Sequence, residues 1–418
     1  MIRIPELRSL KSALMILPNL FVTLMLLSAL PRTVYADSPA PPAGKPAAAV
    51  KEDPEVKMGR EASDSINKQV KLITSGPIFD RVNRIGQAIA TAANEGPVPA
   101  LFGSNVYKKF HYTFHVIDSP DVNAFSLPGG FVYVNTGLVK FVHSDDELAA
   151  VLSHELGHVL HHHALTLEHQ QSKIQNILTP LEIAAVGLML SGHTSQSDAG
   201  TSLLMSSQLY SVARMNGYSV HAEEDADHTA IYLMMRTKYN PAALYTFMLR
   251  LANYEASHGP SMLGIYRDHP PTPQRVATAK ALLEKLNIPI YLSQIDPSWR
   301  AEVVEVHLGL VDLARVTVRQ IPVFEVVGEE GQTALERGKA LADTLDYLLD
   351  RGLEPYQIRY SPDRGYVMAL GKPFQNQADA TAQGRTLEEL SHSFSDAVMQ
   401  IDQLKQIEMN DSSFLSTQ

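Results

Sequence analysis

The chain has 418 residues, of which 45% are hydrophobic, so it can bury a sizeable core. It contains no cysteine, which excludes disulfides and a cysteine-linked lipid anchor. Its formal net charge is −10, and the chain after residue 36 holds 31 Lys and Arg against 44 Asp and Glu, which argues against nucleic acid and anionic membrane surfaces as partners.

The first 36 residues predict a secretory signal peptide. Basic residues precede an apolar stretch of 18 residues from Ala13 to Leu30, and Val34-Tyr35-Ala36 fits a cleavage site. An uncleaved membrane anchor is the alternative, because a stretch of this length is at the lower limit for a bilayer span. Pro18 within the stretch favours cleavage. We therefore expect a periplasmic or otherwise exported protein, with an N-terminally anchored protein that faces the periplasm as the alternative.

Composition divides the rest of the chain into four segments. Residues 37–57 are rich in proline and alanine and predict a disordered linker. Residues 58–290 predict a large folded domain, and residues 295–405 predict a smaller one. Residues 406–418 form a polar tail.

The large domain begins with helices and short strands. Apolar residues with helical spacing from Glu52 to about Thr91 predict helices that serve packing. Alternating patterns predict strands at Phe110–Ile117 and Phe131–Asn135. Between them, Asn123–Pro128 reads either as an edge strand beside a functional site or as a structural hairpin turn.

The segment Ser144–His163 predicts a helix that carries the motif His-Glu-x-x-His. Its first residue and Glu147 form a capping-box pattern, and apolar residues follow with helical spacing. On a helix, His154, Glu155 and His158 project at about 0°, 100° and 40°, within one arc. Two imidazoles one turn apart bind one zinc ion, which lowers the pKa of a water to about 7, and the glutamate takes the proton. The alternative is a chance match on a surface helix.

Further histidines, His161 to His163 and His169, extend this helix in sequence. We expect a polar helix end with cations at the C-terminal end of the helix dipole. A second metal site is the alternative, and a metal-storage protein built on it would bind more than one ion per chain. The apolar run Ile177–Leu190 that follows is too short to span a bilayer.

A catalytic zinc has three protein ligands and one open position, so another His, Asp or Glu is required. The best candidates lie in the acidic cluster Glu223–Asp227, at the start of a helical run. Glu223 and Asp227 are four residues apart and share a face, so Glu223 can reach the metal while Asp227 hydrogen-bonds a ligand histidine. A solvated cluster that caps the helix dipole is the alternative.

From about Asp296 the pattern changes to strands and two long helices. Val303–Val318 and Ile321–Val327 alternate like strands, and Thr333–Arg351 is spaced like a helix. The whole reads as a small α+β module without a catalytic constellation. We expect it to dock a partner or present substrate, with an inert packing domain as the alternative.

In matching order from Met58 to Leu286, the sequence resembles the family-48 metallopeptidases. The motifs that carry the resemblance are NAFSLPGG, FVYVNTGLVKF, DELAAVLSHELGHV, EEDAD, YNP and HPPTPQRVA. Two positions depart from the family pattern, because His162 and Val220 stand where relatives often carry arginine. Neither is a ligand position, so these departures bear on substrate contacts more than on zinc.

The resemblance implies an α+β protein: a mainly helical, zincin-like metalloprotease domain with a small antiparallel sheet, followed by the smaller α+β domain. It implies one Zn²⁺ per chain with these ligands: His154, His158 and Glu223. Glu155 is then the catalytic base, and Asp227 orients a ligand or donates a proton. In periplasmic relatives a histidine in the loop after the third ligand can occupy the open zinc position and hold the enzyme latent. His269 matches it as a fourth ligand, and a solvated turn residue is the alternative.

The function that follows is that of an exported zinc endopeptidase which cleaves unfolded or misassembled envelope proteins. Such enzymes commonly hold the peptide antiparallel to an edge strand, here Asn123–Pro128, with little sequence preference. An envelope protein partner is expected at the C-terminal domain. The rival is a chaperone-like protein that holds unfolded chains in the same cleft and keeps a latent zinc site.

Overall fold

The computed structural model describes residues 52–167, 169, 219–258, 263–265, 269 and 272–408. The predicted signal peptide, the apolar run 177–190 and the tail beyond residue 408 lie outside these residues. Within the described part, no helix is both long and apolar enough to cross a membrane.

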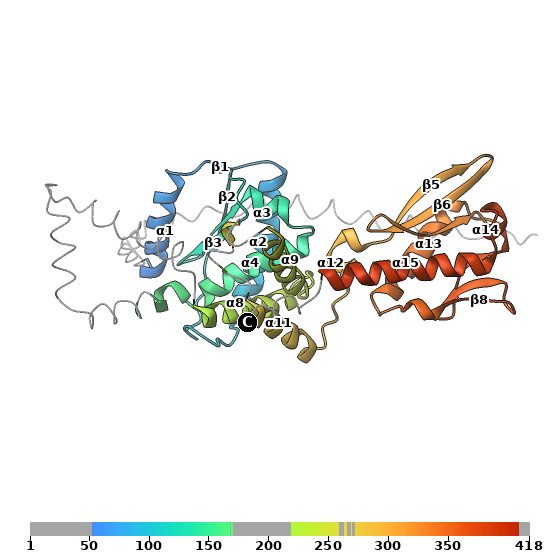
Figure 1. Ribbon diagram of the computed structural model, residues 1–418. Coiled ribbons are helices and arrows are strands. Elements are labelled where there is room, and N and C mark those ends of the chain that lie inside the picture. Colours follow the sequence, from blue (N-terminus) through green and yellow to red (C-terminus); the bar gives the residue numbers. More distant parts are fainter. Residues whose placement is uncertain are drawn as a thin grey trace, which may run out of the picture. The chain divides into compact units, whose positions relative to one another are not determined.

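The N-terminal half combines helices with one four-stranded sheet (Figure 1). Its elements are α1 Pro54–Asn67, β1 Leu72–Ile73, α2 Pro77–Glu95, β2 Thr113–Ile117, β3 Ala124–Leu127, β4 Phe131–Asn135, α3 Thr136–Phe141, α4 Asp145–Leu160, α8 Val220–Met235, α9 Ala243–His258, α11 Pro273–Lys285 and α12 Leu292–Ile295. Helix α1 starts inside the segment predicted as linker, because the Asp53 carboxylate caps the Glu55 N–H and Pro54 fits the first turn.

The sheet has the strand order β1-β2-β4-β3. Its pairs are antiparallel except for β2 and β4, which run parallel, so the small sheet of this α+β fold is mixed. Strand β3 is an edge strand, and Pro128, Gly129 and Gly130 turn it back into β4. Gly129 has φ 78° and Gly130 has φ 99°, a conformation that favours glycine. Residues 123–128 were predicted as either an edge strand or a hairpin turn. The structure contains both, because β3 is an edge strand and forms a hairpin with β4.

Helix α4 runs through the middle of this half and is buried from Glu147 to Leu160. Ser144 caps it as predicted, because its hydroxyl accepts the Glu147 N–H at 3.2 Å. In the predicted capping box, the Glu147 carboxylate would accept the backbone N–H of Ser144. In the structure it accepts the N–H of His143 instead, at 2.7 Å. The helix ends three residues earlier than predicted, before His161.

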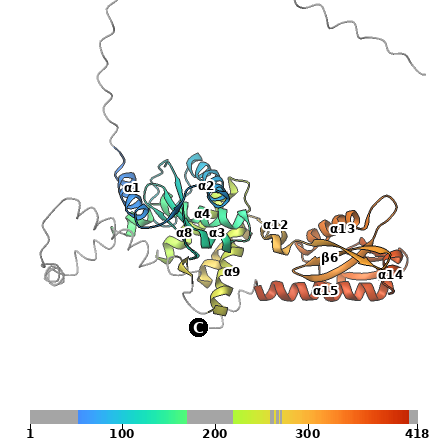
Figure 2. The same ribbon diagram turned by 90° about the horizontal axis from the view of Figure 1, so that it is seen from above.

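The C-terminal half contains two three-stranded antiparallel sheets with strand orders β5-β6-β7 and β10-β9-β8. Its elements are β5 Glu302–Leu308, β6 Val311–Val318, β7 Ile321–Val327, α13 Ala334–Leu349, β8 Ile358–Ser361, β9 Tyr366–Ala369, β10 Lys372–Asn376, α14 Gln377–Ala382 and α15 Leu387–Glu408. Helix α13 packs on the first sheet, and the long α15 contacts strands of both sheets (Figures 1 and 2).

The two halves have separate hydrophobic clusters. The larger cluster runs from Val82 to Ile295, and the cluster of the C-terminal half runs from Trp299 to Ile401. The α+β fold class is therefore confirmed, whereas the exact domain boundaries stay a prediction. Strand β10, which contains Pro373, was not predicted from the sequence. Proline is tolerated there because β10 is an edge strand.

Candidate metal centre

Helices α4 and α8 lie side by side and bring the two sequence motifs together (Figure 1). Gly157 permits the close approach, because a Cβ at this position would lie 3.1 Å from the backbone of Ala226 on α8. Helix α8 begins at Val220, and the Ser219 hydroxyl caps it by accepting the Ala222 N–H at 3.3 Å. Glu223 therefore lies in the first turn of α8 and faces the histidines of α4.

Four side chains converge at this point, and all of them are buried: His154, His158, Glu223 and His269. His154 Nε2 lies 3.1 Å from His158 Nε2 and 3.2 Å from a Glu223 carboxylate oxygen. His158 Nε2 lies 3.5 Å from the other oxygen of Glu223. His269 Nδ1 lies 3.0 Å from Glu223 Oε1 and 3.3 Å from His154 Nε2. The structure thus brings together the three expected ligands and His269.

These separations fit a tetrahedral zinc site. Ligand atoms at the corners of a tetrahedron lie about 3.3 Å apart when each bond to zinc is about 2.0–2.1 Å long. Imidazole nitrogen and carboxylate oxygen are also ligands that zinc takes. With His269 in place, all four positions around such an ion would be filled by the protein.

Electrostatics keep the carboxylate in its ligand form. Burial alone would raise the pKa of Glu223, but the positive charges of His269 and Arg275 outweigh burial and hold the pKa well below its usual range. Burial alone would lower the pKa of His154, but its hydrogen bonds with Asp227 and Glu223 raise it to about 10. A metal ion that binds His154 must therefore displace a proton.

Asp227 lies behind His154, away from the four converging atoms. Its carboxylate lies 2.9 Å from His154 Nδ1, and Arg275 donates two hydrogen bonds to it, from Nε and Nη2, each at 2.8 Å. A third nitrogen of Arg275 lies 2.9 Å from Glu223. Both carboxylate oxygens of Asp227 are thus engaged by Arg275, and one of them also contacts His154.

Sequence reasoning did not assign a role to Arg275. The signal was present, because two carboxylates that are to be buried on one face of α8 require a positive partner. Arg275 belongs to the motif that begins at His269, and Thr272 caps α11 by accepting the Arg275 N–H at 3.3 Å. The start of α11 thereby places the guanidinium between Glu223 and Asp227.

Glu155 is buried beside the cluster without joining it. Its Oε1 lies 3.4 Å from His269 Nε2, and its Oε2 has no hydrogen-bond partner within the described part of the chain. Its backbone carbonyl accepts the Ser126 hydroxyl at 3.0 Å, so strand β3 is tied to the motif helix next to this carboxylate. Glu155 thus lies beside the four converging side chains and is not one of them.

The histidines after the motif were predicted to form a polar helix end with cations at the C-terminal end of the helix dipole. His161, His162 and His163 are all buried, and His162 has a left-handed φ of 53° that breaks the helix. His162 is held by Glu55 of α1 at 2.9 Å and by the Val106 carbonyl at 2.9 Å. These contacts of His162 with Glu55 and Val106, which are distant in sequence, could not be predicted from the local sequence.

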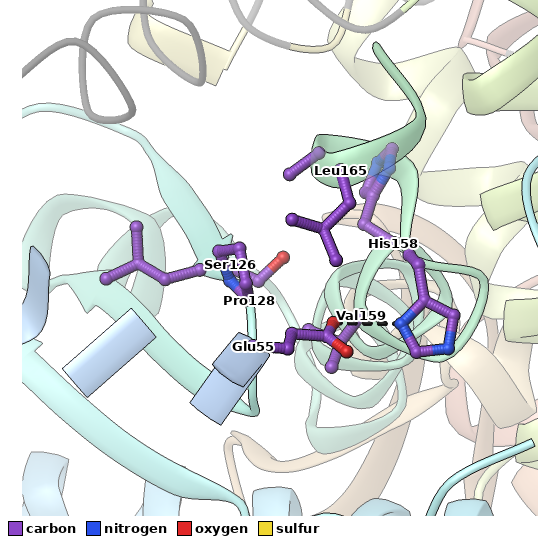
Figure 3. Close-up of a pocket in the computed structure, with 9 residues that line it drawn as sticks. Glu55, Ser126, Pro128, His158, Val159 and Leu165 are labelled. Atoms are coloured by element: carbon purple, nitrogen blue, oxygen red, sulfur yellow. Dashed lines mark hydrogen bonds and ion pairs between the residues drawn. The ribbon is translucent and has the colours of Figure 1, made fainter. Parts of the chain in front are cut away.

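Two pockets flank the centre. The one in Figure 3 lies between α1, β3 and the end of α4, where Glu55, Ser126, Pro128, His158 and Val159 line it. The other combines the polar side chains of the site with an apolar wall, made largely by α9, of Val151, Leu244, Phe247, Met248, Leu251 and Ile265. One pocket therefore lies on the side of β3, and the other lies on the side of α9.

Known proteins resemble this region of the chain. Residues 88–283 match the model of peptidase family M48. The Beta-barrel assembly-enhancing protease of Escherichia coli (strain K12) is 26% identical over 228 residues, which cover 54% of this chain and 43% of that protein. The Putative beta-barrel assembly-enhancing protease of Vibrio cholerae is 27% identical over 195 residues, which cover 46% of this chain and 37% of that protein.

A mitochondrial protein is similar as well. The Mitochondrial metalloendopeptidase OMA1 of Schizosaccharomyces pombe is 29% identical over 177 residues, which cover 42% of this chain and 48% of that protein. The chain thus spans less than half the length of each of these three relatives. The matched residues 88–283 contain all four converging side chains. This region of the chain is thus similar to peptidase family M48.

Proposed function

We propose that the chain is a zinc-dependent endopeptidase that hydrolyses peptide bonds of unfolded or misassembled envelope proteins. The observation that carries the proposal is the convergence of His154, His158 and Glu223 on one point, with the unligated carboxylate of Glu155 beside it. One zinc ion per chain is expected. Relatives named for beta-barrel assembly support envelope proteins as the substrate class.

The residues of the chain divide the work of hydrolysis. A bound zinc ion acidifies water and polarises the scissile carbonyl. Glu155 takes the proton of the attacking water and returns it to the leaving amine, because its carboxylate lies beside the ligand cluster without belonging to it. Asp227 and Arg275 hold His154 and Glu223 in the orientation that the ion requires.

Strand β3 is the proposed binding edge for the substrate. Among the described residues β3 pairs only with β4, so its other edge can accept an extended peptide through backbone hydrogen bonds. Ser126 ties this strand to Glu155, which places the bound peptide bond near the base. Backbone pairing reads little side-chain identity, which suits unfolded proteins of varied sequence.

The same geometry supports a latent resting state. His269 fills the position that water and the scissile carbonyl need, since a catalytic zinc must keep one site open. Gly264 and Ile265, shortly before His269 in sequence, bond to residues that precede β3: Gly264 N–H donates to Asp121 at 2.9 Å, and Ile265 N–H donates to the Val122 carbonyl at 3.0 Å. Ile265 also lies on the apolar wall of α9. The segment thus occupies space that a substrate requires.

Replacing His269 with alanine should convert the latent protein into an active one. We expect faster cleavage of unfolded casein by His269→Ala than by the wild type, with one zinc ion retained per chain, because three ligands remain. His228→Ala is the matched control, since His228 is a half-buried histidine of α8 outside the ligand cluster. Equal cleavage by His269→Ala and the wild type would contradict latency, and absence of cleavage in both would contradict the proposed function.

The observation that favours a second function is the closed site itself. A chaperone-like protein that binds unfolded chains at β3 would need no open zinc position, and four protein ligands are typical of a structural zinc. The His269→Ala assay separates the two functions. Binding of casein without cleavage in the variant would favour the chaperone.

We further propose that the C-terminal half docks an envelope protein through the tip of its β5-β6 hairpin. Leu308, Leu310 and Val311 are exposed there, and Leu310 is fully so. Exposed apolar residues gathered at one tip are typical of interaction sites. Leu310→Ser should therefore reduce crosslinking of the chain to envelope proteins, with casein cleavage by the His269→Ala protein unchanged. The exposed Tyr356→Ser of the same half serves as the control, and equal crosslinking by both variants would refute this docking site.

A further inference from the structure

A second buried cluster lies directly behind the candidate metal centre. His161, His163 and Asp225 meet there, and each is at most 3% exposed. His163 Nε2 lies 3.0 Å from Asp225 Oδ2, and His161 Nδ1 contacts the same oxygen. The other oxygen of Asp225 accepts the backbone N–H groups of Leu101 and Phe102. The carboxylate therefore has partners on every side.

One member of this cluster also touches a candidate zinc ligand. His163 Nδ1 lies 2.8 Å from Nδ1 of His158, whose Nε2 is the atom that faces His154 and Glu223. The turn at His162 makes this contact. On a continuous helix, His163 would be rotated by about 140° from His158, but the left-handed residue between them brings the ring back beneath it.

The position of each proton along this chain of contacts follows from metal binding at His158. A neutral imidazole that gives its Nε2 lone pair to a metal carries its proton on Nδ1. That N–H must donate to Nδ1 of His163, which then carries its own proton on Nε2 and donates it to Asp225. Both rings stay neutral and both N–H groups are satisfied.

The same accounting disfavours a second metal ion at His161, His163 and Asp225. In this network Nδ1 of His163 accepts from His158, so the single proton of the neutral His163 ring is on Nε2. A metal could bind Nε2 only if that proton left, which would turn His163 into an imidazolate anion. The hydrogen-bond network explains the cluster without such a step. His154 has an analogous support, since Asp227 contacts its Nδ1 directly.

We propose that His163 is a positioning residue for the zinc site: backed by Asp225, it accepts the Nδ1–H of His158, fixes the orientation of that ring and strengthens its bond to the metal. This inference rests on the proposed zinc function. Partners of this kind typically change metal affinity by about 10- to 100-fold. His161 shares the carboxylate but points to the Val98 carbonyl at 2.9 Å and does not reach a ligand by any contact in the described residues.

The test compares His163→Phe with His161→Phe. Both remove a buried imidazole from Asp225, so both should lower the stability of the zinc-free protein. Only His163→Phe should weaken zinc binding, by about 10- to 100-fold, when the dissociation constant is measured by competition with a chelator. His163→Asn should restore affinity, because its amide oxygen lies near the place of Nδ1, whereas His163→Gln should not.

The outcomes separate this inference from the proposed function. Equal loss of zinc affinity in both Phe variants, or unchanged affinity in His163→Phe, overturns the positioning role. If the Phe variants fail to fold, the comparison is made between His163→Asn and His163→Gln, and equal zinc affinity of these two variants overturns the positioning role. Two zinc ions per wild-type chain would assign the cluster as a metal site instead. A wild-type chain that binds no zinc would overturn the proposed function, and this inference with it.

Discussion

Replacing Arg275 with methionine should destabilise the zinc-free protein by about 3–5 kcal/mol, the usual effect of breaking a buried ion pair from one side. The guanidinium is buried and makes three short contacts with Glu223 and Asp227, at 2.8, 2.8 and 2.9 Å. Without it, two adjacent carboxylates on one face of α8 would share the interior with only histidines, His154 and His269, as positive partners. Zinc affinity should fall as well, because Glu223 and His154 both lose their support.

Urea unfolding of the zinc-free protein and chelator competition measure the two effects. Arg337→Met is a matched control, because Arg337 is also buried and pairs with Asp379 at 2.7 Å in the C-terminal half. It should lower stability but leave zinc affinity unchanged. Adding Asp227→Asn to Arg275→Met should recover part of the stability, since it removes one of the two negative charges. A destabilisation by Arg275→Met no larger than that of an exposed arginine such as Arg359 would contradict this account.

The parts of the site that could be predicted from sequence depend on local geometry. The spacing of His154 and His158 fixes both on one face of α4 wherever that helix packs. Glu223 and Asp227 are related in the same way on α8. The strand patterns of β4 and β7 were read correctly for the same reason, because alternation with a period of two is a local property.

The parts that could not be predicted depend on contacts between distant segments. Glu55 lies on α1, far in sequence from His162, yet it holds the turn that ends α4. Local propensity alone would continue the helix through His163. The parallel pairing of β2 with β4 likewise follows from β3 taking the edge position beside the motif helix. No periodic pattern within either segment carries that information.

The position of His269 was predicted in part. Its motif suggested a fourth ligand through a family resemblance, and a solvated turn residue was the alternative. The residue is 6% exposed and its Nδ1 lies 3.0 Å from Glu223, so the solvated reading is wrong. Whether His269 binds zinc in the resting protein stays a prediction.

Replacing Glu155 with glutamine should abolish proteolysis without emptying the zinc site. Glutamine has nearly the same shape, but its amide cannot take a proton from water, and a general base contributes about 10²- to 10⁴-fold to the rate. Glu155 does not belong to the cluster of four ligand atoms, so the ion should stay. Ser126 bonds the backbone carbonyl of residue 155, so strand β3 should also keep its place.

The most direct test measures casein cleavage and bound zinc together, in the His269→Ala protein with and without Glu155→Gln. We predict one zinc ion per chain in both proteins and a loss of cleavage of at least about 100-fold in the double variant. Cleavage that survives Glu155→Gln with zinc still bound would contradict the role of Glu155 as the base and, with it, the proposed mechanism. Absence of cleavage in both proteins, with one zinc ion in each, would contradict the endopeptidase itself.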